Sequence, residues 1–213
     1  MNRLEKIANF AKNIHAQNND GHGFDHITRV VALAEKILLT EPSADRELVL
    51  CACYLHDTYD EKLTDNVAGQ KALVSNFLDE IFFDKTVKNK IFEIIDNISF
   101  SANLIERKTL DINGQIVQDA DRLDAMGALG IIRTLEYGWA HGRELYKSTD
   151  KAVKNLTKET YHQNTGCTIN HFYEKLFLLQ DLLNTAEARK IGAKRDKIMH
   201  DFVKAIENES NYF

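Results

Sequence analysis

Four side chains in this 213-residue sequence are candidate ligands of a divalent metal ion. His26 begins a segment with helical apolar spacing, and the pair His56-Asp57 follows an apolar run. Asp121 lies in the acidic stretch QDADRLDAMG. Two imidazoles and two carboxylates form a mixed nitrogen and oxygen set, which suits ions such as Mn²⁺, Fe²⁺, Co²⁺, Zn²⁺ or Mg²⁺. Because a metal-binding imidazole must be neutral, such a site should weaken in acid.

The pair His56-Asp57 is the most informative part of this set. A helix over the preceding apolar run would carry the carboxylate of Asp57 to the edge of the core. An unpaired carboxylate is unfavourable there, and a metal or a cationic partner would remove that penalty. A bare His-Asp dipeptide is common by chance, and a single histidine is usually a surface or hydrogen-bonded core residue. The latter interpretation is preferred for His15, His22, His141, His162 and His200.

The spacing of apolar residues predicts that helices position these side chains. The run LVLCACYL could also form a buried strand, but Val49 is its one β-branched residue, so a helix is preferred. Helices are expected over 3–17, 25–39, 44–57, 67–82, 87–98 and about 118–137, with two more over 168–207.

Two segments are expected to be irregular. Asn113-Gly114, between short apolar stretches, predicts a tight turn, with a small hairpin as one option. The polar residues 140–166 predict an exposed loop or a weak helix. With a single proline, Pro42, and no sign of a linker, the sequence predicts one all-α domain over residues 1–213. The metal-binding core would span about 21–137 and the C-terminal helices 168–207.

The composition limits the classes of partner. A net charge of −5, with 44% hydrophobic and 28% charged residues, is ordinary for a folded soluble protein. Mild acidity argues against broad electrostatic binding of duplex nucleic acid. No apolar run approaches the roughly 20 residues that span a bilayer. Cys51, Cys53 and Cys167 are odd in number and form no CxxC pair, which favours free thiols in the cytoplasm.

The order of the motifs GHGFDHITRV, LHD and DADRLDAMG resembles the HD superfamily of metal-dependent phosphohydrolases. The sequence is similar to the bacterial single-domain HD hydrolases, and the similarity extends through GIIRTLEYG and INHFYEKL. The resemblance implies an HD-type helical bundle that hydrolyses phosphate ester or anhydride bonds, most readily those of nucleotides. It also implies the metal ligands: His26, His56, Asp57 and Asp121. Some relatives have a histidine before SFS where this chain has Ile98, so we expect one divalent ion.

Asp60 and Glu61 are the predicted catalytic residues. They follow Asp57 by three and four positions, which is one turn on if the helix continues. They also resemble the acidic pair after the His-Asp dipeptide in the alarmone hydrolases. We expect one of them to orient the attacking water or to move its proton. The alternative is a solvated acidic turn.

Three cationic residues are predicted to meet the phosphates of a small substrate: Arg29, Lys62 and Arg122. Each could instead make a structural ion pair, and Arg122 has acidic neighbours that favour this. His171 and Lys175 are four residues apart, which is interpreted as a pair on a helix surface rather than as a substrate site. Release of pyrophosphate and release of monophosphate both remain open.

Two alternatives belong to other functional classes. A di-iron HD oxygenase would need ligands for a second ion, and the sequence offers no obvious second set. A non-catalytic metal-binding or ligand-sensing HD domain is disfavoured by the intact ligand set and by the acidic pair Asp60-Glu61.

Overall fold

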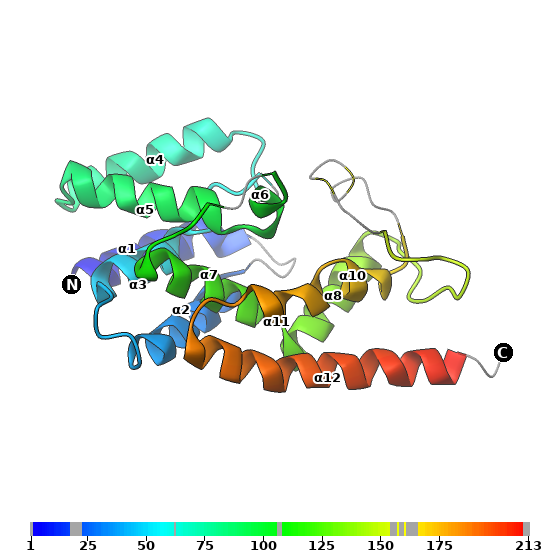
Figure 1. The fold of residues 1–213 in the computed structure, drawn as a ribbon. Coiled ribbons are helices and arrows are strands. Elements are labelled where there is room, and N and C mark those ends of the chain that lie inside the picture. Colours follow the sequence, from blue (N-terminus) through cyan, green and yellow to red (C-terminus); the bar gives the residue numbers. More distant parts are fainter. Residues whose placement is uncertain are drawn as a thin grey trace.

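The structure is a computed structural model that describes residues 2–17, 23–61, 63–105, 108–153, 157, 160 and 166–210. These residues form helices and no strands, which confirms the all-α prediction (Figure 1). The first half contains α1 (Arg3–Ile14), η1 (His15–Gln17), α2 (Phe24–Leu38), α3 (Arg46–Leu55), α4 (Val67–Glu80), α5 (Lys85–Ile98) and α6 (Phe100–Ile105). The second half contains α7 (Ile112–Asp124), α8 (Gly127–Ala140), α10 (Asn170–Glu174), η2 (Leu176–Leu178), α11 (Leu179–Leu182) and α12 (Ala186–Ser210).

Helices α2, α3 and α7 pack against one another and form the centre of the molecule. In Figure 1 they lie between α4 and α5 on one side and the long helix α12 on the other. The predicted helix of the apolar run is α3, where every residue from Leu48 to Cys53 is buried. The side chain of Asp45 begins this helix by accepting a hydrogen bond from the Leu48 N–H. Burial on all sides explains why its apolar pattern lacks a polar face.

The hairpin considered at Asn113-Gly114 is wrong, because both residues lie in the first turn of α7. Asp111 caps this helix by accepting a hydrogen bond from the Gly114 N–H at 3.0 Å. The Asn113 side chain accepts from the Asp45 N–H at 2.7 Å and so ties α7 to the start of α3. Glycine is favoured by close packing, since a Cβ on Gly114 would lie 2.9 Å from the Leu110 Cβ.

The single helix predicted over about 118–137 is in fact two helices. Helix α7 ends at Asp124 and α8 begins at Gly127, whose φ of 77° lies in the left-handed region that favours glycine. Asp121 and Asp124 therefore lie in the last turn of α7. After this change of direction, Arg133 of α8 reaches Asp124.

The chain after residue 166 is anchored to α7 through a buried carboxylate. Asp119 accepts hydrogen bonds at 2.8 Å from the backbone N–H groups of Asn184 and Thr185. The first of the two predicted C-terminal helices is broken into α10, η2 and α11, whereas the second is α12. Helix α12 packs along α8 and α7.

Helices α4 and α5 form an antiparallel pair closed by two ion pairs, Lys71 with Asp96 and Lys88 with Asp79. The cysteines are buried and free, as expected. A search of the described part of the chain finds no helix with the length and apolarity to cross a membrane.

Candidate metal centre

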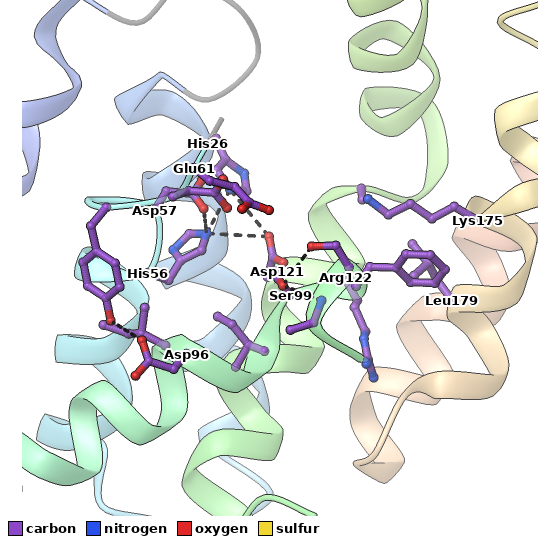
Figure 2. A pocket seen from close by; sticks show the side chains of 18 of the residues that line it. His26, His56, Asp57, Glu61, Asp96, Ser99, Asp121, Arg122, Lys175 and Leu179 are labelled. Carbon is purple, nitrogen blue, oxygen red and sulfur yellow. Dashed lines mark hydrogen bonds and ion pairs between the residues drawn. The ribbon is translucent and has the colours of Figure 1, made fainter. Parts of the chain in front are cut away.

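The four predicted ligands converge from three helix ends that are far apart in the sequence. His26 lies in the first turn of α2, and His56 caps the C-terminal end of α3, with Asp57 directly after it. Asp121 lies in the last turn of α7. Figure 2 shows these side chains pointing towards one another at one end of a pocket. Two of the three helices present their C-terminal ends, where the helix dipole favours a cation.

The separations between the donor atoms match those of ligands that share one ion. Ligands bound at about 2.1 Å stand roughly 3.0–3.4 Å apart in octahedral or tetrahedral geometry. The Nε2 atoms of His26 and His56 are 3.2 Å apart, and they lie 3.4 Å and 3.3 Å from the two carboxylate oxygens of Asp57. Oδ1 of Asp121 lies 3.6 Å from each Nε2. His26, His56 and Asp57 therefore fit a divalent ion in both chemistry and spacing, and Asp121 lies slightly farther from the two imidazoles than ligands of one ion usually do.

Both imidazole rings are held with Nε2 facing the cluster. Nδ1 of His56 donates to the backbone carbonyl of Cys53 at 2.9 Å. Nδ1 of His26 donates to Oδ2 of Asp124 at 2.7 Å. A hydrogen bond at Nδ1 fixes the tautomer that leaves Nε2 available to a metal, and such partners are typical of metal-binding histidines.

The charges in the cluster attract a cation. Burial opposes protonation of His56, but the carboxylates of Asp57 and Asp121 outweigh it and raise the pKa of His56 to about 10. Burial also opposes protonation of His26, whereas Asp124 and Asp57 raise its pKa above the usual value. Burial alone would raise the pKa of Asp121, but the hydrogen bond and charge of His56 lower it. Replacing the protons by a metal ion satisfies the same carboxylates.

Asp124 is a functional residue that the sequence analysis missed. It is buried, and it accepts hydrogen bonds from Arg29 Nε and Arg133 Nη1, both at 2.7 Å, as well as from His26. Burial would raise the pKa of Asp124, but His26 and Arg29 lower it to about 2. Its position three residues after Asp121, on the same side of a helix, was the available signal.

Arg29 therefore lies behind the cluster, with its guanidinium on Asp124 and Asp25. A role for Arg29 in binding phosphate stays a prediction. Lys62, the second predicted phosphate ligand, lies outside the described residues. Arg122 borders the pocket, but its guanidinium donates to the Leu182 carbonyl, and Figure 2 shows it directed away from the cluster.

The cluster of candidate metal ligands closes one end of a pocket of about 290 Å³. Asp60 and Glu61 line this pocket, but not through the continued helix that was considered for them, and their catalytic role stays a prediction. Helix α3 does not continue: it ends at Leu55, and a turn follows in which the Asp60 N–H donates to the Asp57 carbonyl. Figure 2 shows Glu61 beside Asp57 and His26.

Lys175 also borders the pocket, in addition to its predicted place one helical turn after His171. Its N–H donates to the His171 carbonyl at 3.0 Å, and α10 ends there, because Lys175 itself has φ −139° and ψ −58°.

The profile of the HD domain family matches residues 23–126. The Bacillus subtilis protein YpgQ is 32% identical over an alignment that covers 98% of this chain and 94% of YpgQ. Among solved structures, one from Lactobacillus plantarum has a TM-score of 0.91 at 37% identity, covering 99% of this chain and 97% of its own. An HD-superfamily hydrolase from Bacillus thuringiensis has a TM-score of 0.75 at 34% identity, covering 98% and 97%. YpgQ in complex with ADP has a TM-score of 0.76 at 30% identity, covering 97% of each chain.

Replacing any of the four proposed ligands should remove most of the bound metal. We expect alanine variants of His26, His56, Asp57 and Asp121 to purify with little metal, because each loses one of the four donor atoms. Elemental analysis of the folded variants measures this. His141→Ala, at the exposed end of α8, is the matched control and should keep the wild-type metal content. Full occupancy in the His56 or Asp57 variant would rule out the site.

Metal binding at pH 7.5 should release protons. The pKa of His56 is raised to about 10, so its ring is protonated at this pH in the metal-free protein and must lose its proton to bind an ion. The apparent metal affinity should therefore fall as the pH falls, by about tenfold per pH unit for each proton displaced. Calorimetric titration of Mn²⁺ in buffers of different ionisation enthalpy counts these protons. An identical binding heat in all buffers would contradict the assignment.

Proposed function

The chain belongs to the HD domain family, and we propose that it is a metal-dependent phosphohydrolase that acts on phosphate ester or anhydride bonds of nucleotides. The observation that carries this proposal is the set of two histidines and two carboxylates at the closed end of a pocket. Each ring in this set is oriented by a hydrogen bond at Nδ1. Such orientation matches what a catalytic metal needs from its surroundings.

We propose one divalent ion, held by His26, His56, Asp57 and Asp121. When bound, it supplies Lewis-acid chemistry, which activates water near neutral pH and offsets the charge of a phosphoryl group. Ile98 borders the same pocket and supplies no donor atom, which supports a single ion. An ion held by these four side chains would also have room to bind water and substrate.

Asp60 and Glu61 are proposed to act on the attacking water. Both line the pocket beside the cluster, on a turn that begins directly after Asp57. A carboxylate in this position can accept the proton of the water and align it towards phosphorus. Arg29 would act by holding Asp124, and so His26, in place.

A nucleotide substrate is supported by the complex of the relative YpgQ with ADP. The pocket volume of about 290 Å³ is near the lower limit of small-molecule sites, which suits a small phosphorylated compound. A net charge of −5 disfavours binding of long nucleic acids.

A panel of nucleotides tested with several divalent metals examines the proposal directly. We expect hydrolysis of free nucleotides with at least one of Mn²⁺, Mg²⁺, Co²⁺, Fe²⁺ or Zn²⁺, and none of duplex DNA. Phosphorus NMR of the products identifies the bond that breaks, and Asp121→Ala should be inactive. Inert nucleotides together with robust cleavage of DNA would refute the assignment.

Glu61→Gln should lower kcat by roughly 10²- to 10⁴-fold, the usual value of general acid–base assistance, without loss of metal. KM should change little, because the substitution acts on the water and not on the substrate. Asp60→Asn should show a smaller or similar loss, and the double variant separates the two contributions. Glu93→Gln, exposed on α5, is the matched control. Wild-type kcat in all the pocket variants would show that the acidic turn is only a solvated surface.

A further inference from the structure

The pocket has a second wall that comes partly from outside the segment matched by the HD family profile. That match ends at residue 126, whereas Lys175 and Leu179 both border the pocket. Figure 2 shows these two residues on the side of the pocket away from His26 and His56. The C-terminal part of the chain therefore faces the metal cluster across the space in which a substrate would lie.

The backbone around Lys175 is firmly anchored. Lys175 has φ −139° and ψ −58°, and its N–H donates to the His171 carbonyl at 3.0 Å. Its neighbours Glu174 and Leu176 are both buried, and Glu174 accepts a hydrogen bond from the Val153 N–H at 2.9 Å. The anchored backbone between α10 and η2 thus fixes the position from which the Lys175 side chain extends.

The half-buried side chain of Lys175 extends into the pocket. Its Nζ lies 5.5 Å from the centroid of the Phe100 ring, within the range of a cation–π contact. Figure 2 shows its ammonium end directed towards the side of the pocket that holds Asp121. Phe100 begins α6, so this contact joins the C-terminal segment to the HD segment beside the site.

The charged side chains that line the pocket indicate what the Lys175 ammonium group could bind. The carboxylates of Asp60 and Glu61 line the pocket beside the cluster, so a phosphorylated compound bound there needs cationic partners, and Asp96 is already paired with Lys71. The guanidinium of Arg133 is held on Asp124, at the base of the cluster. An ammonium group on the opposite wall is a compact charge that can bind phosphoryl oxygens on the side facing away from the metal.

We propose that Lys175 binds the phosphate oxygens of the substrate and that the Phe100 ring holds its ammonium group in position. The HD segment then supplies the metal, while the C-terminal segment supplies recognition of phosphate charge. This inference rests on the proposed nucleotide hydrolysis and adds a residue that contacts the substrate.

The test is the affinity of the Mn²⁺-loaded protein for ADP, measured by calorimetry at several KCl concentrations. Lys175→Met should weaken ADP binding by about 10- to 100-fold, the usual effect of losing a charged hydrogen bond. It should also make the affinity less dependent on KCl, because one ionic contact is gone. Lys175→Arg, which keeps the charge, should restore much of the affinity. Lys197→Met, an equal charge change on the exposed face of α12, should bind like the wild type.

Phe100→Leu tests the second half of the proposal. It should weaken ADP binding by about two- to fivefold, as expected for a cation–π contact. That effect should vanish when Lys175 is already methionine, because the two residues act through one interaction.

The outcomes separate this proposal from the one it rests on. Wild-type protein that binds and hydrolyses nucleotides, with an unchanged Lys175→Met variant, overturns only the role of Lys175. Equal losses in the Met and Arg variants, with unaltered salt dependence, would show a structural role and overturn it as well. Wild-type protein that retains Mn²⁺ but binds no ADP overturns nucleotide recognition and, with it, this assignment.

Discussion

The proposed metal centre depends on the buried carboxylate of Asp124. A carboxylate that is 1% exposed must be paired, and here its partners are His26 and Arg29 from α2 and Arg133 from α8. The same group therefore holds three helices together and aims one imidazole at the cluster. Removing it would leave two guanidinium groups without a shared partner and one ring without a fixed tautomer, so stability and metal binding cannot be varied independently at this position.

Around Asp124, the arrangement of helix ends decides what the site can do. The first turn of α2 and the last turns of α3 and α7 meet, which places short side chains within reach of one ion. The break at Gly127 is essential to this arrangement, because a continuous helix would carry Arg133 away from Asp124. Asp119, two residues before Asp121, faces the C-terminal segment and binds Thr185. Helix α7 thus supplies a proposed metal ligand on one side and holds the C-terminal wall of the pocket on the other.

The sequence predicted the class of fold and the four candidate side chains that converge in the structure, because apolar periodicity and residue types are local properties. The predictions from sequence failed where the conformation or the contacts of a residue depend on partners far away in the sequence. Asn113-Gly114 is a strong turn signal on its own, but Asp111 and Asp45 incorporate it into a helix. The partner of Arg29 lies 95 residues away in the sequence, so its ion pair was not visible. The place of Lys175 beside the pocket depends on how the chain after residue 166 packs, which its spacing from His171 did not indicate.

The two histidines differ in what fixes their orientation, and this gives them different tolerance to genetic change. His56 donates to the backbone carbonyl of Cys53. Every amino acid has this carbonyl group, so no substitution at position 53 removes the hydrogen-bond acceptor. His26 donates to the side chain of Asp124, and a single codon change at position 124 can remove this acceptor. Over evolutionary time, drift at position 53 should be limited only by packing, whereas position 124 should be held to a carboxylate for as long as the metal is needed.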